Sequence, residues 1–274
     1  MVAPWSRMPV WEAMRPGLIS CSRDTPIGEA AALLRMHRIH AVVVAEQGRQ
    51  VGILSDTDLL AGEWRAEDPE RLAVMRQMKA GELMSAPIAE IEAGAPLAAA
   101  AERLRTLHMA RLLVREDGEL AGVLAISDIV RVIGGIPAGR GLVSDVMSWG
   151  VVACRQSASL AAAARLMTDR RCRSLVAVDR QGRMVGVLSS SDLLPCLYDD
   201  QSVDSTVAEV MHPPITVSAQ ATLAQAADLM LGQRIHRLVV VDPDDPGSFP
   251  PGLVATSDIV KEVSAPGGEW RRAN

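Results

Sequence analysis

Aromatic side chains are scarce in this sequence. Its 274 residues include a single Tyr and a single Phe beside five Trp, and the formal net charge is -5. Proteins that bind single-stranded nucleic acid stack the bases on aromatic rings, and duplex binders neutralise phosphates with clustered Lys and Arg. The composition therefore argues against nucleic acid as a partner.

Long apolar runs are also absent. The chain has no stretch of about 18 apolar residues, the length that a helix needs to cross a bilayer. Its first segment, 1–14, is too polar and too interrupted by proline for a signal peptide. We therefore expect a cytoplasmic protein with no membrane partner.

Close cysteine pairs and catalytic motifs are missing as well. The wide spacing of the cysteines argues against a metal site of the CxxC type and predicts buried free thiols. The cysteines are Cys21, Cys154, Cys172 and Cys196. The sequence has no GxxxxGK[ST] loop, no GxGxxG turn and no recurring Ser-His-Asp or Cys-His constellation. We expect no enzyme, no metal site and no catalytic cofactor.

What the sequence does contain is one motif, present four times. Each copy has a glycine, two aliphatic residues and, three positions later, a hydroxyl–aspartate doublet followed by two more aliphatic residues. The copies span 52–60, 122–130, 186–194 and 252–260. A methionine precedes each copy at an almost constant distance, as Met14, Met84, Met147 and Met211. A repeat of this length is a whole supersecondary unit.

The segment between each methionine and its motif predicts a helix and a strand. Apolar residues recur there at i, i+3, i+4 and i+7, the pattern of an amphipathic helix. These stripes are Ile27/Ala30/Ala31/Leu34, Leu97/Ala100/Ala101/Leu104, Leu160/Ala163/Ala164/Met167 and Leu223/Ala226/Ala227/Met230. A short aliphatic run and a polar turn with glycine then lead into the motif. Each repeat should fold as helix, strand, turn, strand and helix, in an α/β (α+β) protein.

The repeats suggest a two-domain organisation. They run from about 9 to 62, 79 to 134, 143 to 198 and 206 to 263. One repeat is too small to bury an adequate core, so we expect the repeats to pair into domains 1–140 and 141–274. The glycine-rich segment 134–141 marks the boundary, and 63–78 predicts an added helix.

The hydroxyl–aspartate doublet has two interpretations. A Ser, Thr or Asp between a strand and a helix is typical of an N-cap, which satisfies free N–H groups of the first turn. Aspartate nevertheless stands in all four copies, and a carboxylate at such a turn can accept hydrogen bonds from the vicinal diol of a ribose. The first and third repeats add a hydroxyl three residues earlier. The candidate residues are Ser55, Thr57, Asp58, Asp128, Ser189, Ser191, Asp192 and Asp258.

Basic side chains recur just before the first strand of each repeat, at 38–40, 108–111, 170–173 and 234–237. They suit phosphate, or they complement the C-terminal end of the preceding helix. His40 and His236 occupy equivalent positions and are the better ligand candidates. His212 has no such equivalent and is expected at the surface. The five Trp avoid the aliphatic runs, so we expect them to cover seams at the edges of the repeats.

These residues resemble a known family. The starts that end in Met14, Met84, Met147 and Met211, the four glycine-to-aspartate motifs and the stretch 236–241 are similar to CBS domains. Two CBS domains pair into a Bateman module, and two modules in one chain resemble the gamma subunit of AMP-activated protein kinase. The resemblance implies that the motif aspartates hold a ribose. It also implies that basic residues hold phosphate, which carries over to His40, Arg111, Arg173, His236 and Arg237.

The resulting hypothesis is a ligand sensor. The resemblance implies binding of AMP, ADP, ATP or S-adenosylmethionine in clefts between paired CBS domains, with regulation of a protein partner or a homodimer. Ala125 and Ala255 replace the first hydroxyl in the second and fourth repeats, so weaker or differently shaped sites are expected there. The alternative is a structural scaffold subunit whose clefts do not function.

Overall fold

The chain forms two compact units that are not consecutive in sequence. The computed structural model describes residues 4–37, 39–63, 78–134, 141–197, 205–245 and 247–265. Compact unit 1 combines Met1–Leu18, Ala89–Val151 and Ile215–Asn274, and compact unit 2 combines Ile19–Ile88 and Val152–Pro214. Each unit therefore draws on both halves of the chain.

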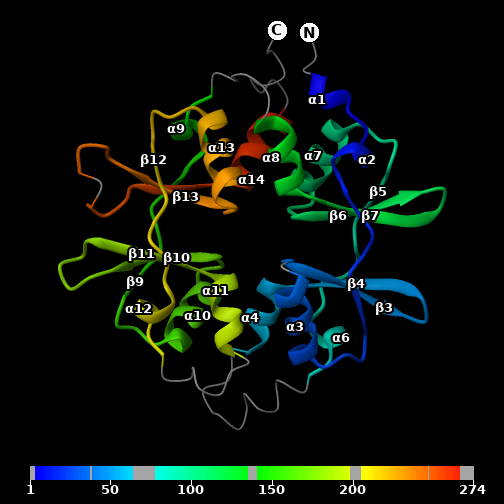
Figure 1. The fold of residues 1–274 in the computed structure, drawn as a ribbon, viewed down its shortest axis with the longest axis horizontal. Helices are drawn as coiled ribbons and strands as arrows, with labels where there is room; N and C mark the ends of the chain where they lie inside the picture. Colours follow the sequence, from blue (N-terminus) through cyan, green and yellow to red (C-terminus); the bar gives the residue numbers. More distant parts are fainter. Residues whose placement is uncertain are drawn as a thin grey trace. The chain divides into compact units, whose positions relative to one another are not determined.

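Each repeat has the predicted order of helix, strand, turn, strand and helix, preceded by one further short strand (Figure 1). The first repeat has β2 (Ser20–Ser22), α3 (Ile27–His37), β3 (Ala41–Glu46), β4 (Arg49–Ser55) and α4 (Asp56–Glu63), and the second has β5 (Glu90–Glu92), α7 (Leu97–Thr106), β6 (Arg111–Glu116), β7 (Glu119–Ala125) and α8 (Ile126–Gly134). The third has β9 (Ala153–Arg155), α10 (Leu160–Asp169), β10 (Ser174–Val178), β11 (Met184–Ser189) and α11 (Ser190–Leu197), and the fourth has β12 (Thr216–Ser218), α13 (Leu223–Gln233), β13 (Arg237–Val241), β14 (Gly252–Ala255) and α14 (Thr256–Ser264).

In every sheet the first strand of the predicted hairpin lies between the second hairpin strand and the short parallel strand. In the first repeat β3 pairs antiparallel with β4 and parallel with β2, and the other three repeats follow the same plan. The short parallel strand has only three residues in each repeat, too few to show an alternating pattern in the sequence. The four helical stripes are buried as predicted, because every one of their residues is at most 5% exposed.

The segment that opens each repeat pairs with the sheet of a different repeat. In β1 (Arg15–Pro16), which opens the first repeat, Arg15 pairs with Val123 of the second. In β8 (Ser148–Trp149), which opens the third repeat, Trp149 pairs with Gly252 of the fourth. Reciprocal single bridges join Ser85 to Ile53 and His212 to Val187. This exchange of opening segments explains why the compact units change at 18/19, 88/89, 151/152 and 214/215.

A short helix positions each opening segment ahead of its landmark methionine. These helices are α2 (Val10–Ala13), α6 (Ala80–Leu83), α9 (Val143–Val146) and α12 (Val207–Val210). The first residue of each helix is buried. Its carbonyl accepts a hydrogen bond from the backbone N–H of the methionine, which ends the helix. The methionine then begins the extended stretch that reaches the other sheet.

The core of compact unit 1 is built from the helices of the second and fourth repeats. Helix α8 packs on α13 and α14, and α14 also packs on α7, as Figure 1 shows in green, orange and red. In compact unit 2, α4 of the first repeat packs on α11 of the third, and Leu60 of α4 joins the apolar cluster of the third repeat. Both cores combine residues from the two halves of the chain. The division into modules 1–140 and 141–274 stays a prediction.

The structure agrees with some expectations for the tryptophans and cysteines and differs from others. Trp5 of α1 (Pro4–Arg7) is only 2% exposed within the core of compact unit 1, so the expectation that the tryptophans cover seams is wrong for this residue, whereas Trp11 and Trp149 are exposed. Cys21 and Cys154 are buried free thiols, whereas Cys172 is only partly buried, so the expectation of a buried thiol is wrong for Cys172. Burial raises the pKa of Cys154 to about 11. The predicted helix at 63–78 and the boundary at 134–141 lie largely outside the described residues.

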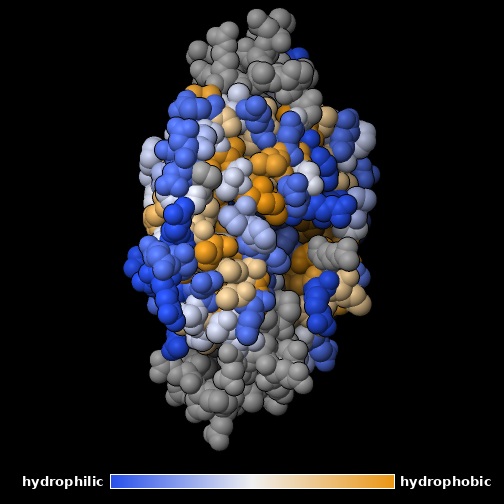
Figure 2. All heavy atoms as spheres, turned by 60° about the vertical axis from the view of Figure 1, so that its left-hand side comes forward, coloured by the Kyte–Doolittle hydropathy of each residue, from blue (hydrophilic) through white to orange (hydrophobic). Residues whose placement is uncertain are grey.

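The surface mixes polar and apolar residues. On the face drawn in Figure 2, hydrophobic patches in orange are separated by hydrophilic residues in blue. No helix in the described part of the chain combines the length and the apolar character that crossing a membrane requires. The same residues contain no group of three or more His, Cys, Asp or Glu side chains arranged to hold a metal ion.

Candidate ligand-binding turns

The motif aspartate closes the strand-to-helix turn in the same way in every repeat. Its Oδ2 atom accepts a hydrogen bond from the backbone N–H three residues earlier, which lies at the end of the strand. The distances are 2.8 Å for Asp58 to Ser55, 2.8 Å for Asp128 to Ala125, 2.7 Å for Asp192 to Ser189 and 2.9 Å for Asp258 to Ala255. This is the return bond of a capping box, in which a side chain on the third helical residue binds the backbone of the cap. The aspartate therefore stabilises the helix start in all four repeats with one carboxylate oxygen, but as the third helical residue and not as the N-cap that the sequence suggested.

In compact unit 2 the carboxylates are surrounded by hydroxyl and imidazole groups. The Ser55 hydroxyl donates to Asp58 Oδ2 at 2.6 Å, and the Ser85 hydroxyl of an opening segment donates to Asp58 Oδ1 at 2.9 Å. In the third repeat the Ser189 hydroxyl donates to Asp192 Oδ2 at 2.6 Å, and Nε2 of His212 lies 3.2 Å from Asp192 Oδ1. The sequence predicts a surface position for His212 and gives it no role in a site. The structure confirms that 69% of its side chain is exposed and adds the contact with a motif aspartate.

In compact unit 1, where Ala125 and Ala255 lack the first hydroxyl, cations lie beside the other carboxylate oxygen, Oδ1. Asp128 Oδ1 lies 3.2 Å from Arg15 Nε and 3.3 Å from an Arg131 nitrogen, and Asp258 Oδ1 lies 3.5 Å from Lys261 Nζ. Arg131 and Lys261 stand three residues after their aspartates, where the first and third repeats have Ala61 and Pro195. The alanine substitutions at 125 and 255 thus coincide with a nearby positive charge.

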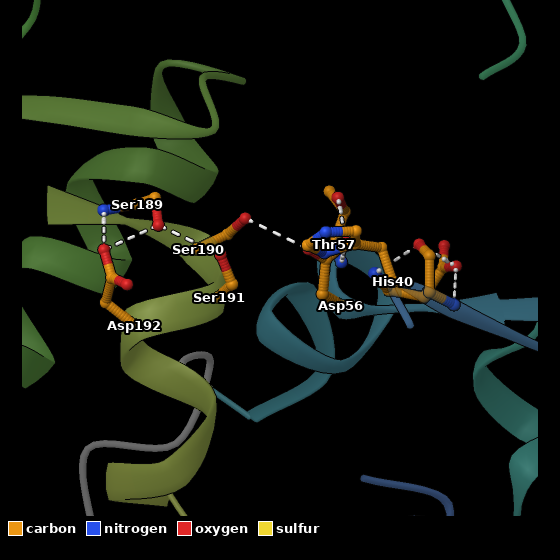
Figure 3. A network of polar contacts seen from close by, with 9 residues as sticks. His40, Asp56, Thr57, Ser189, Ser190, Ser191 and Asp192 are labelled. Atoms are coloured by element: carbon orange, nitrogen blue, oxygen red, sulfur yellow. Dashed lines mark hydrogen bonds and ion pairs between the residues drawn. The ribbon is translucent and has the colours of Figure 1, made fainter. Parts of the chain in front are cut away.

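The hydroxyls of the doublets in compact unit 2 also contact their own turns. The Thr57 backbone N–H donates to Asp56 Oδ1 at 2.8 Å, and its hydroxyl lies 3.3 Å from the same atom. The Ser191 hydroxyl lies 3.0 Å from that of Ser189 (Figure 3). Both candidates are therefore part of the local turn structure.

A buried carboxylate that the sequence did not single out connects the first and third repeats. Asp56 is 5% exposed, His40 Nδ1 lies 3.4 Å from its Oδ2, and the Ser190 hydroxyl reaches that same oxygen at 3.4 Å (Figure 3). Asp56 and Ser190 begin equivalent helices, and Ile126 and Thr256 occupy this position in the other two repeats. Of the four equivalent residues only Asp56 is acidic, and this difference is visible in the sequence.

The basic candidates lie beside the turns because of a shared backbone contact. The carbonyls of His40, Arg173 and His236 accept the N–H of the first residue of the final helix in their repeats, at 3.2, 3.0 and 3.0 Å. Arg111 and Arg237 begin their strands directly opposite Ala125 and Ala255. Each repeat therefore brings its basic candidates to the edge of the sheet where its aspartate stands. That these side chains hold a ligand stays a prediction.

Known structures share this fold. Protein MJ1225 from Methanocaldococcus jannaschii, described as a candidate archaeal homolog of g-AMPK, has a TM-score of 0.81 and 20% identity, with coverage of 93% of this chain and 99% of that one. A conserved protein from Pyrococcus horikoshii has a TM-score of 0.64 and 20% identity, with coverage of 94% and 100%. At these identities the likeness shows the fold alone.

Sequence relatives and a family model complete the comparison. The chain is 24% identical to protein MJ1404 of Methanocaldococcus jannaschii over 93% of its own length, and it spans 62% of that protein. The model of the CBS domain matches residues 10–63, 80–135, 143–199 and 207–265. These matches cover well over half of the sequence and coincide with the four repeats of the fold, so the chain belongs to the CBS domain family.

Proposed function

We propose that this protein is a regulatory sensor that binds adenosine-containing nucleotides through its motif aspartates. The observation that carries the proposal is the position of a carboxylate and a basic residue at one edge of the same sheet in every repeat. One carboxylate oxygen caps the helix in each turn. The second oxygen can accept from a ribose diol, and the neighbouring cation suits phosphate.

The turns at Asp58 and Asp192 are the best candidates. Their second oxygens face a serine hydroxyl and an exposed histidine. A hydroxyl rotates to suit its partners, so it can share the carboxylate with a sugar. Family membership supports adenosine-containing ligands such as AMP, ADP, ATP or S-adenosylmethionine.

A sensor needs an output, and we infer a regulatory one. A ligand that binds one conformation of the repeats better than another shifts the population towards that conformation. The shift would change the surface that is offered to a protein partner or to a second copy of the chain. In the described turns each aspartate uses one carboxylate oxygen to accept a backbone N–H at the start of a helix. This arrangement supports ligand binding more directly than catalysis of a reaction on the ligand.

Isothermal titration calorimetry with AMP, ADP, ATP and S-adenosylmethionine tests the proposal. The informative variants are Asp58→Asn and Asp192→Asn, because an amide oxygen can still accept the capping N–H while the charge is lost. We expect binding to weaken about tenfold to a hundredfold at the altered turn, since a hydrogen bond to a charged group contributes about 1.5–3 kcal/mol. The melting temperature should change little.

Asp117→Asn is the matched control. It makes the same chemical change in the exposed hairpin between β6 and β7, where Asp117 has a φ of 51° that asparagine tolerates well. Binding should equal that of the wild type. If none of the four ligands binds and the two turn variants alter only thermal stability, the aspartates serve as caps and the scaffold alternative is favoured.

A further inference from the structure

Asp128 differs from the other motif aspartates in its burial. Its side chain is 1% exposed, against 18% for Asp192 and 13% for Asp258. The Oδ2 atom caps the helix, and the Oδ1 atom lies between the guanidinium groups of Arg15 and Arg131. Both oxygens therefore have partners, and one of the two oxygens faces two positive charges.

The segment that carries Arg15 is bound on two sides, by backbone pairing and by the side chain of Arg131. Arg15 comes from the opening segment of the first repeat and pairs with Val123 in the sheet of the second. The Gly17 N–H donates to the Ala121 carbonyl at 2.9 Å, and Arg131 donates to the Ala13 carbonyl at 2.9 Å. The segment is thus bound to β7 on one side and to α8 on the other, so the fold fixes the backbone of Arg15. Its side chain is 60% exposed and reaches Asp128 through Nε.

The residue that follows the landmark methionine differs among the four opening segments. The equivalents of Arg15, each directly after a landmark methionine, are Ser85, Ser148 and His212. At Asp58 the donor is the Ser85 hydroxyl, and at Asp192 it is a histidine with most of its side chain in solvent. Among these four residues only Arg15 is always charged and donates in a fixed geometry.

We propose that Arg15 closes the Asp128 turn to ligand, so that the four repeats bind nucleotide unequally. This inference rests on the proposed function, because it concerns which of its turns are available. A ribose diol would have to displace a charge-assisted hydrogen bond with neutral ones. It would also leave a buried charge poorly paired, which is costly. Among the described residues, a serine hydroxyl at position 15 would leave Arg131 as the one remaining cation at Asp128 Oδ1, and its own neutral hydrogen bond would be easier to displace.

Exchanging the two residue types tests the proposal in both directions. Arg15→Ser gives the second repeat the residue found at 85 and 148, and it should add one equivalent of bound nucleotide per chain. Ser85→Arg should close the Asp58 turn and remove one equivalent. Stoichiometry is measured by calorimetry and by equilibrium dialysis with AMP and S-adenosylmethionine as probes. Arg7→Ser, at an exposed residue of α1, is the control and should leave the stoichiometry unchanged.

The outcomes separate this inference from the proposed function. If the wild type binds a probe but Arg15→Ser gains no equivalent and Ser85→Arg loses none, Arg15 does not control access and only this inference fails. Four equivalents bound by the wild type would also overturn it. If the wild type binds neither probe and neither variant does, the proposed function fails with it. Should Arg15→Ser not fold, Ser85→Arg decides alone, because Ser85 is an exposed residue.

Discussion

Glycine begins each of the four motifs because an opening segment lies directly against its Cα atom. A Cβ built on Gly122 would collide with the backbone oxygen of Arg15, and one built on Gly252 would collide with that of Ser148. On Gly52 and Gly186 the colliding atoms belong to the side chains of Met84 and Met211. The two compact units therefore use the same glycine for different contacts. In compact unit 1 the backbone of an opening segment lies against the glycine of the motif. In compact unit 2 the flexible side chain of a methionine packs against that glycine.

This difference predicts unequal costs for the same substitution. Gly122→Ala should lower the free energy of unfolding by about 2–3 kcal/mol, because neither backbone can move without breaking the pairing of β1 with β7. Gly52→Ala should cost about 1 kcal/mol, since an unbranched methionine can adopt another rotamer. Urea unfolding followed by circular dichroism measures both.

Gly94→Ala is the control for this pair. The glycine lies in a turn, and a Cβ added there would meet nothing within 4 Å. Its effect should be within about 0.5 kcal/mol of zero, as for most surface substitutions. Equal costs for Gly122→Ala and Gly52→Ala would show that the opening segment of the first repeat is not pressed on β7 as described.

Among the elements, the short helix α1 fixes the start of the chain to α7. Its Trp5 is buried among the residues of the unit 1 core, although the indole N–H has no hydrogen-bond partner in the described part of the chain. Burying an unsatisfied donor costs about 1–3 kcal/mol, so the apolar contacts of the ring must exceed that cost. The ring, rather than its polar atom, holds the helix.

Replacing the ring in two ways separates these contributions. Trp5→Ala should destabilise the protein by about 3–5 kcal/mol, the range for deleting a buried large aromatic side chain. Trp5→Phe should change stability by less than about 1.5 kcal/mol, because the smaller ring loses some contact but removes the unsatisfied donor. Trp11→Ala, at a side chain that is 52% exposed, serves as the control in the same urea titration. Equal losses for the two Trp5 variants would contradict this account.

At the same scale, the sequence predicts the elements whose signal is local. The alanine-rich stripes of α3, α7, α10 and α13 and the hairpins that follow them are present because periodicity depends on neighbouring residues. The partners of an opening segment are different. Nothing in the residues around Arg15 or His212 indicates that they meet an aspartate of another repeat, because that contact is set by how distant segments pair. The candidate turns could be listed from sequence, but the groups around their carboxylates could not.

For the whole molecule, the cores do not follow the order of the chain. The predicted halves, 1–140 and 141–274, each contribute helices to both compact units. In compact unit 1, α7 and α8 from the first half cover α13 and α14 from the second. A half expressed alone would expose these helical faces to water. Burial of apolar area is the dominant stabilising contribution in folding, so each half lacks part of what stabilises it.

Expressing the halves separately turns this into a measurement. We expect 1–140 and 141–274 each to pair with a second copy of itself, because an equivalent repeat can replace the missing one, and to unfold at a lower urea concentration than the full chain. Co-expression should give a one-to-one complex that is more stable than either half. Light scattering after size exclusion gives the masses, and circular dichroism in urea gives the stabilities. A half that remains a monomer and unfolds as cooperatively as the intact chain would mean that each half has a complete core, and the shared helical contacts would then contribute little to stability.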